Sequence, residues 1–333
     1  MNVRTLLAAL LVAAPITCNA STPRATPADA PRQLPIEYAA DRYFVTPTAK
    51  SGEKLRFFTD TGGGFIVHAD TAERLGLATR TIGEGEDKGT FAPFPEFAAT
   101  GWIPPPTADT RPLPYRNLMY VAPRSPHSES FGDGMLGQEW FGGGVWTFDY
   151  PGRALSWQDS AAGVDFDPRH TAKLGFPAGD DGVRSGNFPS IEATIDGETL
   201  PFLFDTGATL ELSDEGLEAL GDGGPKSRGT SFIVASVFDR WREKHPGWRV
   251  IERAEDNRGA APIIEVPEIV IAGHRVGPVW FTRRPDPNFH EFMSKFMDRR
   301  VEGALGGSAF RYFRITVDYP GARALFERAQ AAP

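Results

Sequence analysis

The stretch Phe57-Phe58-Thr59-Asp60-Thr61-Gly62 occurs a second time in this chain, as Phe202-Leu203-Phe204-Asp205-Thr206-Gly207, 145 residues further on. In each copy a short, mostly apolar run leads directly into an aspartate. A buried strand that ends in a carboxylate is unfavourable on its own, because an unpaired charge is costly to remove from water. The repeat therefore predicts that Asp60 and Asp205 lie at strand ends and have a chemical function.

Further matches extend the duplication. Leu75-Gly76 matches Leu220-Gly221 at the same offset of 145, whereas Gly134-Met135-Leu136-Gly137 matches Gly303-Ala304-Leu305-Gly306 at an offset of 169. A collinear series of this kind indicates an internal repeat. Because the offset grows by 24, the second copy carries 24 extra residues, which we expect within residues 233–300.

Asp149-Tyr150-Pro151-Gly152 recurs as Asp318-Tyr319-Pro320-Gly321, also at an offset of 169. Asp, Pro and Gly are turn-forming residues, so we interpret both aspartates of this second repeat as turn residues and not as catalysts.

The repeat predicts the organisation of the whole chain. Alternation in Ile191–Ile195, followed by Asp196-Gly197, predicts a hairpin, and apolar spacing predicts helices over residues 69–75, 214–220, 234–245 and 288–300. We expect a mostly β protein of two similar lobes with short helices. The expected segments are a signal peptide 1–20, a flexible tether or short propeptide 21–42, an N-terminal lobe 43–157, a linker 158–186, a C-terminal lobe 187–326 and a tail 327–333.

Composition excludes several classes of function. The chain has 333 residues, of which 41% are hydrophobic and 23% charged, which is typical of a globular protein. A net charge of −8 without Lys/Arg blocks argues against nucleic-acid binding. No long apolar run follows the first two dozen residues, so several membrane spans are excluded. We expect a monomer.

The N-terminus predicts export. Met1–Ala20 has a basic residue, an apolar run from Leu6 to Ile16 and a small-residue end, which is the layout of a signal peptide cleaved after Ala20. The destination would be the periplasm or the medium. Lipoprotein processing at Cys18 is the alternative, but Pro15-Ile16-Thr17 is a poor match to the sequence that precedes a lipidated cysteine.

The sequence lacks the residues that several other catalytic mechanisms require. The six histidines are scattered without zinc-ligand spacing, so we expect no metal. A Gly-x-Ser-x-Gly nucleophile motif is absent, and the one cysteine lies in the signal peptide. We expect no cofactor.

What remains is that Asp60 and Asp205 meet across a pseudo-two-fold axis. Two adjacent carboxyls share one proton, because both cannot ionise at that distance, so one serves as acid and the other as base. Such a pair can activate water to attack a carbonyl group. Thr61 and Thr206 would hydrogen-bond across the axis. Gly62 and Gly207 would let backbone N–H groups approach the carboxylates.

These paired motifs, each followed by a downstream apolar-apolar-Gly, resemble the aspartic peptidase superfamily of pepsins and retropepsins. The resemblance covers residues 43–326. It implies a bilobal aspartic-protease-like fold with two β-barrel-like lobes, and a hydrolase of the aspartic endopeptidase type. It also implies a polypeptide substrate in the cleft between the lobes. Leu136-Gly137 and Leu305-Gly306 would support the active-site loops.

The chain departs from the pepsin pattern at two points. Pepsins place Ser or Thr after Asp-Thr-Gly, where this chain has Gly63 and Ala208; the latter is similar to retropepsins. Gly63-Gly64 predicts a looser first loop and leaves open a weakly active or inactive peptide-binding protein on the same fold. The Gly-rich segments Ile82–Phe91 and Gly221–Thr230 are either two flaps or ordinary surface loops.

Overall fold

The computed structural model describes residues 30–85, 88–107, 110–125, 131–256 and 259–328. The predicted signal peptide with Cys18 and the end of the predicted tail lie outside these residues. No helix in the described ranges is both long enough and apolar enough to cross a membrane.

The chain is mostly β, as predicted, with 39% of it in strands and 16% in helices. Its strands form sheets of eight, nine, six and two strands. None of the sheets formed by the described residues closes into a barrel, so the barrel-like form expected of each lobe is not found. The eight-stranded sheet, for example, ends on β2 (Ile36–Ala39) and β6 (Arg80–Ile82), which are not hydrogen-bonded to each other.

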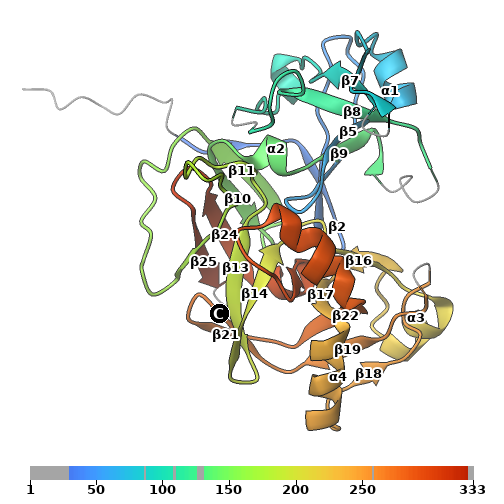
Figure 1. The fold of residues 1–333 in the computed structure, drawn as a ribbon, viewed down its shortest axis with the longest axis vertical. Helices are drawn as coiled ribbons and strands as arrows, with labels where there is room; N and C mark the ends of the chain where they lie inside the picture. Colours follow the sequence, from blue (N-terminus) through green and yellow to red (C-terminus); the bar gives the residue numbers. More distant parts are fainter. Residues whose placement is uncertain (1–29, 86–87, 108–109, 126–130, 257–258, 329–333) are drawn as a thin grey trace, which may run out of the picture.

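The eight-stranded sheet holds the first Asp-Thr-Gly loop. Most of its strands come from the first copy, and β5, β7, β8 and β9 lie with α1 (Ala69–Arg74) in the upper part of Figure 1. In spatial order they are β2 (Ile36–Ala39), β3 (Arg42–Val45), β4 (Phe57–Thr59), β9 (Gly134–Leu136), β5 (Phe65–His68), β8 (Leu118–Ala122), β7 (Gly89–Pro93) and β6 (Arg80–Ile82).

The nine-stranded sheet holds the second loop. Its strands come from the second copy; β18, β19 and α4 mark the lower end of the molecule in Figure 1. In order they are β18 (Val250–Ile251), β19 (Ile263–Val266), β22 (Val279–Arg284), β17 (Ser231–Val234), β23 (Gly303–Leu305), β14 (Glu198–Phe204), β13 (Ser190–Ile195), β20 (Ile269–Ile271) and β21 (His274–Val276).

A six-stranded sheet joins the two copies. β10 (Val145–Asp149) pairs antiparallel with β24 (Phe313–Asp318), and Thr147 lies opposite Thr316 with their hydroxyl oxygens 3.1 Å apart. These threonines are 169 residues apart, which is the offset of the sequence repeat here. The pair therefore marks where a pseudo-two-fold axis crosses the sheet. The other strands are β1 (Arg32–Gln33), β11 (Ala154–Gln158), β25 (Arg323–Arg328) and β12 (Thr171–Lys173).

Two segments predicted to be unpaired contribute strands. β1 and β2 lie within the predicted tether, and β12 lies within the predicted linker, where it pairs with β25. The sequence pattern did not predict these edge strands, because they are short and their surroundings are rich in polar, turn-forming residues.

The predicted helices are present. α1 (Ala69–Arg74) and α3 (Asp214–Leu220) follow the two Asp-Thr-Gly loops, and α4 (Ala235–Lys244) follows β17. Ser213 caps α3 by accepting the Gly216 N–H at 2.9 Å. The helix predicted over 288–300 is shorter and irregular, with a π-helical turn η5 (Asn288–Phe292) and a 3₁₀ turn η6 (Met293–Phe296). The remaining short elements are α2 (Gln138–Phe141), η3 (Ala99–Gly101), β15 (Thr209–Glu211), β16 (Ser227–Gly229) and α5 (Gly307–Phe310).

The copies differ in one strand pairing. In the first copy, β5 follows the Asp-Thr-Gly loop and pairs with β9. In the second copy, β15 follows the loop but pairs with β16, and β17 is the strand that pairs with β23. Burial explains the exchange. All four residues of β17 are buried, but only the middle residue of β15 is. The sequence match at the constant offset of 145 therefore predicts the equivalence of α1 and α3 correctly, but it does not predict which strand pairs with β9 or with β23.

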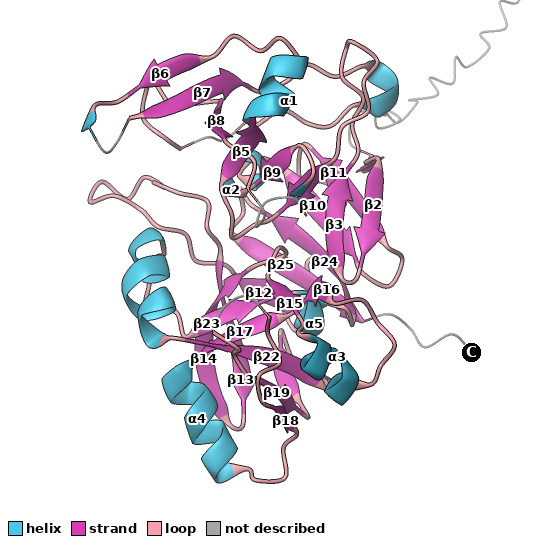
Figure 2. Ribbon diagram, turned by 90° about the vertical axis from the view of Figure 1, so that its right-hand side faces the viewer, coloured by secondary structure: helices cyan, strands magenta, loops and turns pink. Residues whose placement is uncertain are grey.

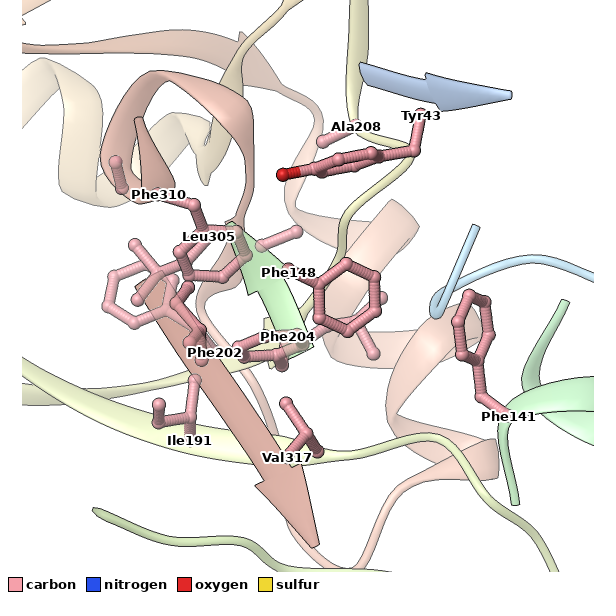
Figure 3. Close-up of a cluster of buried hydrophobic side chains, with 14 of the residues drawn as sticks. Tyr43, Phe141, Phe148, Ile191, Phe202, Phe204, Ala208, Leu305, Phe310 and Val317 are labelled. Atoms are coloured by element: carbon pink, nitrogen blue, oxygen red, sulfur yellow. The ribbon is translucent and has the colours of Figure 1, made fainter. Parts of the chain in front are cut away.

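One continuous core lies beneath both loops. Side chains from both copies, including Phe148, Phe204 and Phe310, pack in it, as Figure 3 shows. The Phe204 and Phe310 rings are stacked with centroids 4.4 Å apart. Because Phe204 directly precedes Asp205, this packing fixes the backbone from which that aspartate projects.

Candidate active site

Each Asp-Thr-Gly loop begins at the end of a strand, and each of these two strands pairs in parallel with a neighbour. β4 runs parallel to β9, and β14 runs parallel to β23. The Asp60 N–H donates to the Leu136 carbonyl at 3.1 Å, and the Asp205 N–H donates to the Leu305 carbonyl at 2.8 Å. The two Leu-Gly segments thus hold the backbone of the two aspartates, in the supporting position expected of them.

The two threonines tie the loops together across the axis. The Thr61 N–H donates to the Thr206 hydroxyl at 3.2 Å, and the Thr206 N–H donates to the Thr61 hydroxyl at 3.0 Å. The Thr61 hydroxyl itself donates to the Phe204 carbonyl at 2.7 Å. Both side chains are fully buried, so these bonds are shielded from water.

The glycines allow the loops to touch. The Gly62 N–H donates to Asp60 Oδ1 at 2.8 Å, and the Gly207 N–H donates to Asp205 Oδ1 at 3.0 Å. Each glycine also lies against the opposite aspartate. A Cβ added to Gly207 would lie 2.2 Å from Asp60 Cγ, and one added to Gly62 would lie 2.9 Å from Asp205 Cγ. Any side chain at either position would push the loops apart.

The carboxyl groups of Asp60 and Asp205 hydrogen-bond to each other. Burial raises the pKa of Asp205 well above its usual range, and the negative charge of Asp60 raises it further. Burial also raises the pKa of Asp60, while the hydrogen bonds from Asp205 and the Gly62 N–H oppose that rise. The two carboxyls therefore share one proton as a pair.

The first loop has no room for a side chain at Gly63. A Cβ there would lie 2.5 Å from Met135 Sδ and 2.6 Å from Asp60 Oδ2. In the second copy Ala208 occupies the equivalent position, and its N–H donates to the Asp205 backbone carbonyl at 3.4 Å. The Met135 side chain thus fills the space beside Gly63, so the glycine is required by packing and is not simply a source of flexibility.

Gly63→Ala is expected to displace the Asp60 carboxyl, lowering kcat for any reaction of the pair by about 10²-fold and stability by about 1–3 kcal/mol. Gly64→Ala is the matched control, because an added Cβ there would meet only Ile66, at 3.7 Å. Thermal unfolding and activity assays on both variants test this. Equal effects of the two substitutions would contradict the packing role of Gly63.

The two Gly-rich segments differ in their surroundings. β6 and β7 form a hairpin at the free end of the eight-stranded sheet, as Figure 2 shows. The second segment is instead fixed to the residues that lead into the first copy: the Gly229 N–H donates to the Ala40 carbonyl at 2.7 Å, and Arg42 Nη1 donates to the Ser227 hydroxyl at 2.8 Å. The second segment is therefore anchored, which does not suit a moving flap.

Asp149 and Asp318 lie in turns, as predicted. Asp149 Oδ1 accepts the Gly152 N–H and Asp318 Oδ1 accepts the Gly321 N–H, each at 2.8 Å. Both carboxylates are thus used to close their own turns.

Sequence reasoning missed a buried ion pair near Asp205. Arg284 Nη1 and Nη2 donate to Glu255 Oε2 and Oε1 at 2.6 and 2.7 Å, and both side chains are at most 5% exposed. The two residues are 29 positions apart, on different strands or loops, so no local pattern signals their pairing. Arg284 also lines the pocket beside Asp205.

Within the described ranges, no group of three or more His, Cys, Asp or Glu side chains is placed to hold a metal ion. Neither a scan against protein-family models nor a search of curated proteins finds a match to this chain.

Proposed function

We propose that this chain is an exported aspartic endopeptidase with two similar lobes, which hydrolyses peptide bonds with water activated by Asp60 and Asp205. The observation that carries the proposal is that crossed threonine bonds hold the two duplicated loops together, with each strand-end aspartate against the glycine of the other loop. Export follows from the predicted signal peptide. The lobes would correspond to the eight- and nine-stranded sheets, with the six-stranded sheet between them.

The mechanism uses one proton on the pair. Ionised Asp60 takes a proton from a water molecule as the water oxygen attacks the peptide carbonyl carbon, and Asp205 gives its proton to the carbonyl oxygen. The resulting tetrahedral diol then collapses. Asp60, now protonated, gives its proton to the amide nitrogen and the C–N bond breaks. Ionised Asp205 takes a proton from a diol hydroxyl as the carboxylic acid product forms, so the pair again holds one proton. The crossed threonine bonds hold the two carboxyls in place, so little reorganisation is needed.

A weakly active or inactive peptide-binding protein on the same fold is the alternative. The loops favour it, because neither Gly63 nor Ala208 has the hydroxyl that pepsins place at this position. Their N–H groups donate instead to the backbone carbonyls of Asp60 and Asp205, at 3.1 and 3.4 Å.

Cleavage of an unfolded protein across a pH series separates the two functions. A peptidase gives a bell-shaped profile of kcat/KM, because one carboxyl must be ionised and the other protonated. A statine-containing peptide, which imitates the tetrahedral diol, is expected to stabilise the fold by about 2.7 kcal/mol at 100 times its Kd. Binding without cleavage from about pH 3 to pH 8 would favour the binding protein.

A further inference from the structure

A groove of about 470 Å³ lies on the first copy, outside the carboxyl site. Its wall includes Pro93, the last residue of β7, and the connection that follows this strand. Among the described residues that line it, none belongs to an Asp-Thr-Gly loop or to the pocket beside Asp205. Most of the lining side chains are proline or aromatic, among them Pro93, Phe94, Pro95, Phe97, Trp102 and Pro105. We call this feature the aromatic groove.

The surface of the aromatic groove suits an uncharged, apolar segment of chain. Phe94, Phe97 and Trp102 are half-buried, because each packs against the core and also faces the groove. The charged side chains that line the groove, Lys50 and Glu96, pair with each other at 2.5 Å. Grooves lined by aromatic rings bind proline-rich segments, because the fixed φ of proline reduces the entropy lost on binding.

Arg32 holds the N-terminal part of the chain at the edge of this groove. Its guanidinium carbon lies 4.1 Å from the centroid of a Trp102 ring. The contact is fixed by strand pairing, because Arg32 of β1 lies opposite Trp157 of β11, and the Trp157 ring packs edge-on against Trp102. The described chain begins at Ala30, two residues before this contact. The residues that precede Ala30 are therefore attached beside the groove.

These preceding residues have the composition that such a groove favours. Residues 21–31 follow the predicted signal-peptide cleavage and read Ser-Thr-Pro-Arg-Ala-Thr-Pro-Ala-Asp-Ala-Pro. One arginine and one aspartate leave this stretch without net charge, as the Lys50–Glu96 pair leaves the groove. Fully extended as polyproline, residues 21–29 reach about 28 Å, at about 3.1 Å per residue. Length therefore does not prevent them from entering the groove.

We propose that the aromatic groove binds residues 21–29 of the same chain. The N-terminal segment is then docked on the first copy and leaves the carboxyl site open. It serves neither as a free tether nor as a propeptide that blocks the site. The inference does not depend on peptidase activity.

Disulfide trapping tests the docking in the chain that begins at Ser21. This chain has no cysteine, because the one cysteine of the sequence is Cys18. Thr26→Cys is combined with Glu96→Cys, since Glu96 is exposed and lines the groove. Docking is expected to form the intramolecular disulfide about tenfold faster than in the same chain with Pro23→Ser/Pro27→Ser.

Thr26→Cys with Asp159→Cys is the matched control. Asp159 is exposed and directly follows β11, the strand that holds β1, so an undocked segment would reach it as readily as the groove. Docking is expected to make trapping slower at position 159 than at position 96. Equal rates at the two positions, or a rate at position 96 that the serine substitutions leave unchanged, would overturn the inference.

A synthetic peptide of residues 21–31 identifies the occupant without relying on where the cysteines are placed. Because a short linker gives an effective concentration of the order of millimolar, the peptide is added at about 10 mM and is expected to slow trapping at position 96 several-fold. A peptide with serine in place of its prolines should have no effect. Equal effects of the two peptides, or a disulfide that forms only between chains, would overturn docking within one chain.

Cleavage of an unfolded protein shows whether the docked segment leaves the carboxyl site open. The trapped chain is expected to cleave at the same rate as the chain before trapping. Slower cleavage after trapping would make residues 21–29 an inhibitory propeptide and would overturn the inference. If neither form cleaves, the peptidase proposal fails, whereas the trapping rates still decide whether the groove binds this segment.

Discussion

Asp205→Asn is expected to lower peptide cleavage by about 10³-fold or more, because the variant has no proton to give to the carbonyl oxygen. Asp60→Asn is expected to have the same effect, because it removes the base. Both variants keep the size of the side chain and leave the crossed threonine bonds in place. The measurement is the rate of cleavage of an unfolded protein at the pH optimum of the wild type.

Stability is expected to change in the opposite direction for Asp205→Asn. The pKa of Asp205 is raised in the folded chain, whereas an unfolded aspartate has a pKa of about 3.9. The folded state therefore holds the proton more tightly, so its contribution to stability is complete below about pH 3.9 and is lost as pH rises through the raised value. The neutral amide does not titrate. The variant should thus gain on the wild type as pH rises.

Asp149→Asn is the control for the cleavage measurement. Asp149 is also repeated between the copies, but its carboxylate closes a turn by accepting the Gly152 N–H. The variant should retain cleavage. If Asp205→Asn cleaved as fast as the wild type, or if its stability fell equally at all pH values, the role assigned to this carboxyl would be wrong.

Glu255→Gln is expected to destabilise the fold by about 3–5 kcal/mol, because it leaves the Arg284 charge buried without its counter-charge. Glu96→Gln is the matched control. Glu96 pairs with Lys50 at 2.5 Å, but the two side chains are 74% and 68% exposed, so water screens the interaction. We expect the control to lose far less stability than Glu255→Gln. Denaturant unfolding of both variants gives the comparison.

A double variant checks the cause of that loss. In Glu255→Leu/Arg284→Met both charges are replaced by apolar side chains of similar length, so no uncompensated charge remains. Its stability is expected to exceed that of Glu255→Gln. A double variant that is less stable than the single one would show that Arg284 and Glu255 act through packing and not through their charges.

The sequence was sufficient to predict the centre of the candidate site. Asp60, Thr61 and their second-copy equivalents were predictable because a motif repeated at two strand ends gives two equivalent loops, which an internal two-fold axis can bring together. The helices α1 and α3 were predictable for a different reason, because their apolar spacing is a local pattern.

Features that depend on distant contacts could not be predicted. The sequence predicts that Gly63 makes its loop looser, whereas in the structure the side chain of Met135, 72 residues away, fills the space beside it. β15 has the same place in the sequence as β5, yet it lost its sheet neighbour to the more buried β17. The pocket beside Asp205 likewise depends on how the segment Asn288–Met293 packs, which its composition alone does not determine.

The central claim is that Asp60 and Asp205 hold a single proton between them, and carboxyl ¹³C NMR titration of the labelled aspartates tests it most directly. The account predicts two widely separated, mutually dependent steps, with one carboxyl still protonated well above pH 4 and with the upper step lost in Asp60→Asn and Asp205→Asn. Two independent titrations, both near pH 3.9, would contradict it.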